Sequence, residues 1–480
     1  MIHPASFSCF ANSFSGTPSS FGLIKGQFCK LADIIDFFFV VHPESGRLET
    51  KESDRIFYFY GTKNESVDKQ TQLTGFAEAV VNFTENFVEE DCAGKTAEFP
   101  FRDVHTAKQL HVYILVESAK FIVGIGVNKM QCTVENYVLH APTIRKVVCT
   151  AYSMFRLFFG HFTALFNQNI EELKGRLEYF FSRYLPLLRL HKMPLLDLFC
   201  GVDFLALDSL NYLRVENLVS CVLESFPKIL KYMFFFQERL LTYTVPKRDL
   251  PVLFRYLTQN ILSTSMRAEL QPELERHHKG RFLTGVTDVS AQTIIVNAKE
   301  SKLPVVYLSN EDDNFSLSPY ELIVYRALNA TFCMFIQKDD DVSFLQKLDD
   351  ELGPELSILA SGIGDSFELA SDLPRKEVDF HFIYYNPVSL SIKSSFMEQI
   401  GFTKVCCRIS YTFLMDNQSG EIMLKTESNW CVAAKYLNDR YLIIFTSGLS
   451  TTTVAEFAET VVLLRSEIKI FFSYWFFHFL

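Results

Sequence analysis

Basic clusters, paired cysteines and long apolar runs are all scarce in this sequence, and each absence argues against a class of protein. Acidic residues outnumber basic ones, 56 against 46, and the formal net charge is -10. No basic stripe or arginine-rich arm is present, which argues against nucleic-acid binding because phosphates require clustered Lys and Arg. The apolar C-terminal stretch is interrupted by Arg465, Glu467 and Lys469, and the remainder is about half of the 20 residues that a bilayer requires. We expect no membrane span, and a buried last element is favoured for this aromatic tail over contact with a membrane interface.

The eleven cysteines are scattered along the chain and include no CxxC pair. Cys406 and Cys407 are adjacent, and neighbouring side chains splay apart too far for an ordinary disulfide. The N-terminus lacks the basic region and apolar stretch of a signal peptide. We therefore expect buried free thiols in a reducing compartment, which predicts a cytoplasmic protein.

Motifs for catalysis and for nucleotide or metal binding are also lacking. The segment nearest to a phosphate-binding loop, Gly124 to Lys129, has no third glycine and no Ser or Thr, so a turn is favoured there. The adjacent His277 and His278 are expected in a solvated loop rather than on a metal. Cys200 lies in a predicted apolar strand without a basic neighbour, and no Gly-x-Ser-x-Gly elbow occurs. The sequence predicts no catalytic residue, cofactor or metal site, and hence no covalent enzyme chemistry.

What the sequence does contain is an ordinary folded composition with one excess. Apolar residues make up 48% and charged residues 21% of the 480 residues, a length that suits two to four domains. Phenylalanine occurs 48 times. Because aromatic side chains dominate buried area, core filling is favoured over a partner-binding surface as the reason for this excess.

Apolar periodicity predicts alternating strands and helices from residue 34 onward. The first strand, Ile34 to Val41, is followed by a strand at 55–60 and a helix at about 75–88. Strands at 110–116 and 121–125 and helices at about 143–166 and 170–187 come next. This order favours an antiparallel sheet with helices packed on it.

The same order of elements recurs twice. The second set has a strand at 195–205, a helix at 210–226, a hairpin at 230–245, a helix at 249–262, strands near 281–283, 305–308 and 322–336, and a helix at 342–352. The third has strands at 380–385, 420–425, 430–435 and 441–445 and a helix at 453–464. We therefore predict an α/β fold of the α+β type with domains at 32–190, 191–370 and 371–480, after a poorly ordered leader at 1–31.

Eight segments carry a resemblance to a known family: 34–46 (IIDFFFVVHPESG), 75–87 (GFAEAVVNFTENF), 151–162 (AYSMFRLFFGHF), 176–191 (RLEYFFSRYLPLLRLH), 195–208 (LLDLFCGVDFLALD), 280–285 (GRFLTG), 321–328 (ELIVYRAL) and 380–386 (FHFIYYN). In this order and spacing they resemble the vacuolar fusion proteins of the calcium-caffeine-zinc sensitivity family. The resemblance covers about residues 33 to 470 and is strongest from 151 to 208. It implies three longin-like domains, each an antiparallel sheet flanked by helices.

The same resemblance implies a function. Members of the family pair with a monensin-sensitivity family subunit, and the heterodimer is a guanine nucleotide exchange factor for a late-endosomal, Rab-seven type GTPase. Such a complex acts in endosome maturation, lysosome or vacuole fusion and autophagy, and it is recruited peripherally to late endosome and lysosome membranes. An exchange factor of this kind requires no catalytic side chain, because it acts by binding the nucleotide-free GTPase.

In this family the first longin domains of the two subunits pair side by side to form the platform for the GTPase. On the matching helix, the spacing of Phe76, Val80, Phe83 and Phe87 predicts the core face. The opposite face is expected to be free to meet a partner, and it presents Glu78, Asn82 and Glu85. A plain solvated face remains equally open for each of these three.

The strand Ile56 to Tyr60 is expected at the edge that meets the partner subunit, with Ile56, Tyr58 and Tyr60 as contact residues. An unpaired edge is a ready template for sheet extension. Two other functions stay open at this point. One is a longin scaffold or an exchange-factor subunit for a different Rab, of the lysosome-related-organelle or planar-polarity type. The other is an enzyme with an unrecognised site.

Overall fold

We describe the protein from a computed structural model, over residues 28–46, 52–62, 65–85, 99–118, 120–263, 280–284, 303–310, 316–337, 342–371, 381–394, 403–409, 420–425, 430–437 and 440–447. The chain divides into two compact units. The N-terminal unit comprises residues 20–200 and 398–416, and the C-terminal unit contains residues 201–397 and 417–480. Each unit is described by itself below.

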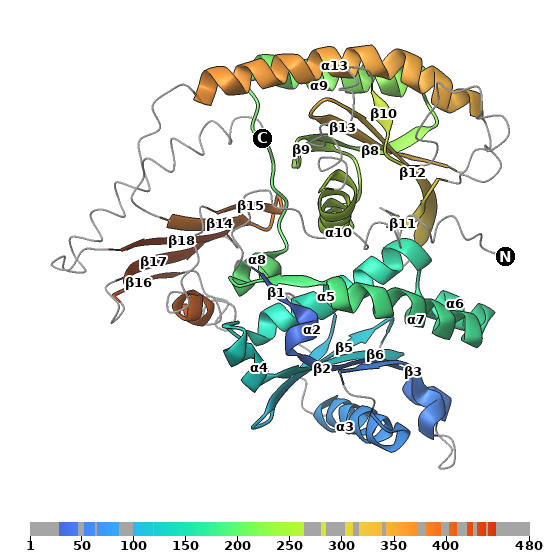
Figure 1. The fold of residues 1–480 in the computed structure, drawn as a ribbon, viewed down its shortest axis with the longest axis vertical. Helices are drawn as coiled ribbons and strands as arrows, with labels where there is room; N and C mark the ends of the chain where they lie inside the picture. The colour runs from blue at the N-terminus through green and yellow to red at the C-terminus, as the bar shows by residue number, and fades with distance from the viewer. Residues whose placement is uncertain are drawn as a thin grey trace. The chain divides into compact units, whose positions relative to one another are not determined.

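The N-terminal unit is built on a five-stranded antiparallel sheet with the order β3-β2-β6-β5-β4. One face is covered by helix α3, and the other is covered by α5, α6 and α7 (Figure 1). Strands β2, β3, β5 and β6 confirm those predicted in this region, whereas β4 was not predicted. Their bounds are β2 Ile35–Val41, β3 Ile56–Gly61, β4 Phe101–His105, β5 Gln109–Val116 and β6 Phe121–Asn128, and the helices are α3 Val67–Glu85, α5 Ala141–Phe159, α6 Phe162–Gln168 and α7 Ile170–Leu187.

Alternation along β2 sends its phenylalanines to opposite faces of the sheet. Phe37 and Phe39 belong to the core beneath α3, and their rings stack with centroids 5.9 Å apart. Phe38 packs on Phe181 of α7, with ring centroids 4.8 Å apart. The run of three phenylalanines therefore fills both halves of the core, as the core-filling interpretation of the excess predicts.

Two glycines of β6 make room for those rings. A Cβ atom on Gly124 would lie 2.2 Å from the Phe39 ring, and one on Gly126 would lie 2.2 Å from the Phe37 ring. The turn predicted at Gly124 to Lys129 is therefore wrong, because both glycines lie inside a paired strand. Their lack of a side chain serves aromatic packing.

Smaller elements complete the N-terminal unit. Of the predicted leader 1–31, residues 1–27 lie outside the described residues, whereas β1 Phe28–Lys30 pairs with β7 Arg189–His191. The helix predicted at 143–166 is two helices, because Gly160, at φ 80°, ends α5. The short helices are α2 Leu31–Ile34, η1 Pro43–Gly46, η2 Glu52–Arg55, α4 Lys129–Val134 and α8 Pro194–Phe199, and 403–409 is also helical.

The first sheet of the C-terminal unit lies between a long helix pair, α9 and α13, and the shorter α10 (Figure 1). Core residues of α9 and α13 pack on Phe234, Phe332 and their neighbours on one face. Helix α10 continues into the π-helical turn η4 Leu257–Leu262. The elements are β8 Ile229–Phe236, β9 Arg239–Tyr243, β10 Arg281–Phe282, β11 Val305–Ser309, β12 Leu317–Ala327, β13 Ala330–Ile336, α9 Ser209–Ser225, α10 Leu250–Tyr256 and α13 Val342–Ser371.

Two predictions in this region are wrong. The strand predicted at 195–205 begins instead with helix α8, since Pro194 at its first turn favours a helix start. The helix predicted at 342–352 continues to Ser371, because the apolar spacing of Leu352, Leu356 and Leu359 carries it past Pro354.

The second sheet of the C-terminal unit has the order β15-β14-β18-β17-β16. All three large sheets therefore share one strand order. From one edge to the other, their strands are the second, first, fifth, fourth and third in chain order. In the first sheet of the C-terminal unit β11 takes the third place, and the additional strand β10 also pairs with β12. The helix predicted at 453–464 lies outside the described residues. The strands are β14 His381–Asn386, β15 Ser391–Ser394, β16 Gly420–Lys425, β17 Trp430–Leu437 and β18 Arg440–Ser447.

Candidate partner-binding surface

Strand β3 is an edge strand, as the sequence predicts. In the described part of the chain it pairs with β2 alone, in an antiparallel register from Phe37 opposite Gly61 to Val41 opposite Ile56. Its outer side therefore presents backbone N–H and C=O groups of the kind that accept a further strand.

The three side chains predicted as contacts on β3 differ in exposure. Tyr58 is only 4% exposed, because its ring packs against Phe38 and Phe181. Burial also raises the pKa of the Tyr58 phenol. Ile56 is half-buried against the core beneath α3, and Tyr60 is half-buried as well. The side chain of Tyr58 is thus part of the core, and only its backbone can serve a partner.

Helix α3 lies on the sheet with a different face from the one predicted. Thr74, Ala77 and Val81 are buried, whereas Phe76 is 42% and Phe83 is 69% exposed. The prediction that the phenylalanines face the core is wrong for both, and Phe87 lies outside the described residues. The small side chain of Ala77 allows the helix to approach the sheet, whose own Phe37 and Phe39 supply the aromatic bulk there.

Glu78 is not free to meet a partner. Its carboxylate accepts a hydrogen bond from Arg55 Nη1 at 2.7 Å, and both side chains are 14% exposed. This ion pair ties α3 to the residue that precedes β3. Asn82 is exposed as predicted, and the side chain of Glu85 lies outside the described residues.

Phe76 covers a buried polar network on the sheet. Its ring meets that of His111 edge-on, with centroids 5.9 Å apart. His111 is held by Tyr113 Oη at 2.8 Å and Gln109 Oε1 at 2.9 Å, and Gln109 in turn donates to Asp36. Burial lowers the pKa of His111, although Asp36 opposes this. The imidazole is therefore neutral at pH 7, and its two hydrogen bonds hold it beneath the Phe76 ring of α3.

The outer stripe of α3 comprises Phe76, Ala79, Asn82 and Phe83, of which the sequence predicts only Asn82. A signal for it was present. Leu73, Ala77 and Val81 repeat every four residues and form a second apolar stripe, on the side that does pack on the sheet.

Most of the thiols in the described part of the chain are buried, as expected, whereas Cys200 is half-buried and Cys221 is exposed. Burial raises the pKa of Cys29, Cys132 and Cys407 to about 12, so these groups are protonated at pH 7. Cys200 lies at the left-handed end of α8 instead of in the predicted strand. In the described part of the chain, no three or more His, Cys, Asp or Glu side chains are arranged to hold a metal ion. His277 and His278 lie outside the described residues.

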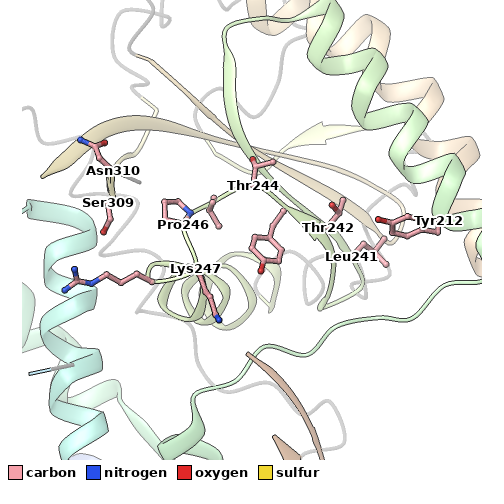
Figure 2. Close-up of a pocket in the computed structure, with 11 residues that line it drawn as sticks. Tyr212, Leu241, Thr242, Thr244, Pro246, Lys247, Ser309 and Asn310 are labelled. Carbon is pink, nitrogen blue, oxygen red and sulfur yellow. The ribbon is translucent and has the colours of Figure 1, made fainter. Parts of the chain in front are cut away.

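A cavity of about 700 Å³ in the C-terminal unit lies beside β9 and the segment that follows it (Figure 2). Three polar residues of its lining form hydrogen bonds within the protein. Ser309 donates its N–H and its hydroxyl to Asp249, and Asn310 donates to Ser316. Thr244 Oγ1 accepts the Tyr232 N–H.

Comparison with known proteins shows that two of the three large sheets belong to regions that match longin domain families. Residues 35–160 match the model of the first longin domain of INTU, CCZ1 and HPS4, and residues 229–353 match that of the Intu longin-like domain 2. A vacuolar fusion protein CCZ1 homolog of Xenopus tropicalis is 30% identical over 442 residues, which cover 85% of this chain and 90% of the relative. The chain belongs to the CCZ1 family.

Other CCZ1 homologs show the same extent of similarity. The Danio rerio homolog is 29% identical over 85% of this chain and 89% of its own length. The Nematostella vectensis homolog is 26% identical over 89% of this chain and 95% of its own length. The resemblance seen in the eight segments is thereby confirmed. Among the described residues, no helix combines the length and the apolar character needed to cross a bilayer.

Proposed function

We propose that this chain is one subunit of a heterodimeric guanine nucleotide exchange factor for a late-endosomal, Rab-seven type GTPase. The observation that carries the proposal is membership in the CCZ1 family, whose relatives are named vacuolar fusion proteins. The second subunit is of the monensin-sensitivity family, and the complex acts in endosome maturation, lysosome or vacuole fusion and autophagy. It is recruited from the cytoplasm to late endosome and lysosome membranes by peripheral contact.

The first domain supplies the partner-binding surface in this proposal. The outer edge of β3 extends the sheet into the partner subunit, through backbone hydrogen bonds that depend little on side-chain identity. The outer stripe of α3 lies on the same domain and presents exposed aromatic surface, which is enriched at protein interfaces. Asn82 and Phe83 replace Glu78 as the residues that contact the partner or the GTPase.

In this proposal nucleotide exchange results from differential binding and not from covalent catalysis. The complex binds the nucleotide-free GTPase more tightly than the nucleotide-bound form, and so it accelerates release of GDP. No side chain of this chain forms or breaks a bond. The third domain is proposed to be a further longin domain, which its shared strand order supports.

Release of fluorescent GDP from a Rab-seven type GTPase tests the proposal. The heterodimer of this chain with a monensin-sensitivity family subunit should accelerate release. Phe83→Arg should reduce the acceleration or the yield of heterodimer. Val134→Arg places the same residue on another exposed apolar position of the N-terminal unit and should change neither.

An intact heterodimer that leaves the release rate unchanged would exclude the function. Acceleration on a Rab of the lysosome-related-organelle or planar-polarity type alone would favour the alternative exchange factor. A scaffold would bind a Rab without accelerating release.

A further inference from the structure

Residues 201–205 run as an extended segment between two sheet edges of the C-terminal unit. Val202 bridges to Ser391 of β15 in parallel: its N–H donates to Leu390 O at 2.8 Å, and its C=O accepts the Ile392 N–H at 3.1 Å. The other side of the segment bonds to β9. The Leu240 N–H donates to Asp203 O, and the Leu205 N–H donates to Leu240 O, each at 2.9 Å. One short segment thus pairs with an edge strand on either side.

The segment is anchored by packing and by charge. Val202 and Phe204 are buried. The Asp203 carboxylate accepts from Lys393 Nζ of β15 and lies 3.3 Å from Arg239 Nε of β9. Lys393 Nζ also donates to Phe204 O at 2.7 Å. Asp203 therefore contacts one cation from each of the two sheets that the segment joins.

The entry to the segment requires glycine. A Cβ atom on Gly201 would lie 2.5 Å from Ile392 Cβ and 3.1 Å from the Leu390 carbonyl oxygen. Contacts below 3.0 Å force a shift of one partner, and here they are made with Ile392 Cβ, which is fixed to the backbone of β15, and with Ile392 Cγ2 at 2.8 Å. Gly201 thus allows the backbone to approach β15 closely enough for Val202 to pair.

The two edges closed in this way correspond to the β3 edge of the N-terminal unit. In the shared topology, β3, β9 and β15 are each the second strand in chain order and each lie at the same end of their sheet. The chain pairs its own residues with β9 and β15, whereas β3 has no such partner among the described residues. Open edges invite pairing with other chains, and proteins commonly cover them.

We propose that residues 201–205 form a latch that joins the two sheets of the C-terminal unit and closes the β9 and β15 edges, so that of these three equivalent edges only β3 is left for strand pairing with another chain. The latch itself stands on the contacts above. Only the role of β3 rests on the proposed function, and the two are tested by different measurements.

Hydrogen exchange of the full-length chain, in its purified complex, tests the latch. In the wild type, the amides of Leu240 and Ile392 should be protected although they lie on terminal strands. Gly201→Ala should speed their exchange by about tenfold, as expected for loss of hydrogen bonds of ordinary strength. Amides of the central strand β13 should be unchanged. The matched control is Gly364→Ala, because nothing lies within 4 Å of a Cβ at that position.

A milder variant covers the case in which Gly201→Ala unfolds the whole unit. Asp203→Asn keeps the backbone and removes the charge that pairs with Lys393, and it should speed exchange of Ile392 without affecting β13; Asp365→Asn, on exposed α13 surface, is its control. Light scattering should also show concentration-dependent association of the Gly201→Ala protein through the opened edges. Unprotected Leu240 and Ile392 amides in the wild type, or full protection in both variants, would overturn the proposal whatever the GDP-release assay shows.

Discussion

His42, His111 and His140 are buried in the N-terminal unit and have lowered pKa values, because burial penalises the charged imidazolium. The effect is largest for His140, where burial and then Arg145 lower the pKa to about 4 from 6.5. At a pH between these two pKa values, His140 is protonated in the unfolded chain but not in the folded protein. Stability is therefore lost as pH falls from 6.5 to 4, and for His140 the loss amounts to about 3 kcal/mol.

We accordingly expect the melting temperature of the complex to fall steadily between pH 6.5 and 4.5. His140→Gln should flatten this slope, since glutamine does not titrate. His105→Gln, at the exposed end of β4, should leave the slope as it is. Melting curves at half-unit pH intervals measure the effect, and equal slopes for wild type and His140→Gln would contradict it.

Glu117 determines how the α5–α6 break attaches to the sheet. Its carboxylate accepts the Phe162 and Thr163 N–H groups at 2.6 Å and the Tyr152 hydroxyl at 2.8 Å. Burial opposes ionisation, but hydrogen bonds from His161, Thr163 and Tyr152 lower the pKa of Glu117 below its ordinary value. The ionised carboxylate thus stabilises the fold at any pH above the ordinary pKa of a glutamate. This contribution is lost as the pH falls through the lowered pKa of the folded state.

Glu117→Gln should cost about 2 kcal/mol at pH 7, because hydrogen bonds to a buried charged group are replaced by weaker ones. Chemical denaturation of the reconstituted complex measures it. Glu171→Gln, on exposed α7 surface, is the control and should stay within about 0.5 kcal/mol. A neutral Glu117→Gln variant would show that the carboxylate does not hold this junction.

At the scale of the element, the glycines of β6 set how closely the aromatic layer packs on the first sheet. Gly126→Ala should destabilise the N-terminal unit by about 1 to 3 kcal/mol, since the new methyl overlaps the Phe37 ring. Gly175→Ala in α7 has open space around its Cβ and should be neutral or slightly stabilising. Thermal melts of the two variants measure this difference in stability, and equal melting temperatures would contradict the overlap.

The orientation of α3 yields a contrast between two phenylalanines. Phe39→Ala empties a fully buried site and should cost about 3 to 5 kcal/mol. Phe83→Ala removes a largely exposed ring and should shift stability by less than about 0.5 kcal/mol, while weakening partner binding or exchange. Melting temperature and GDP-release rate on the same preparation separate the two effects. A large loss of stability for Phe83→Ala would restore the face that the phenylalanine spacing predicts.

For the whole molecule, the β3 edge, which is open among the described residues, and the exposed aromatic stripe on α3 predict dependence on a partner. Expression of this chain alone should give aggregation or poor yield, and co-expression with a monensin-sensitivity family subunit should restore soluble protein. Size-exclusion chromatography with light scattering measures the outcome. A monodisperse, cooperatively folded monomer at roughly micromolar concentration would contradict this expectation.

Much of the local structure follows from the sequence alone. Alternating or continuous apolar runs predict β2, β5, β6, β8 and β9, and the helical spacing of α7 and α9 predicts their ends to within a residue or so. These signals are local, because side-chain period depends on the backbone conformation of neighbouring residues. The edge position of β3 was expected from the family resemblance, and the strand order confirms it.

Which face of α3 is buried was decided only by tertiary structure. Two apolar stripes run along that helix, and the sheet selects the one with the small Ala77, because Phe37 and Phe39 already fill the space against Gly124 and Gly126. The ion pair of Glu78 with Arg55 likewise joins residues 23 positions apart. In the latch, Asp203 contacts Lys393, which lies 190 positions further along the chain. Propensity and period describe one element at a time, whereas these choices depend on volumes and charges that distant segments bring to the same place.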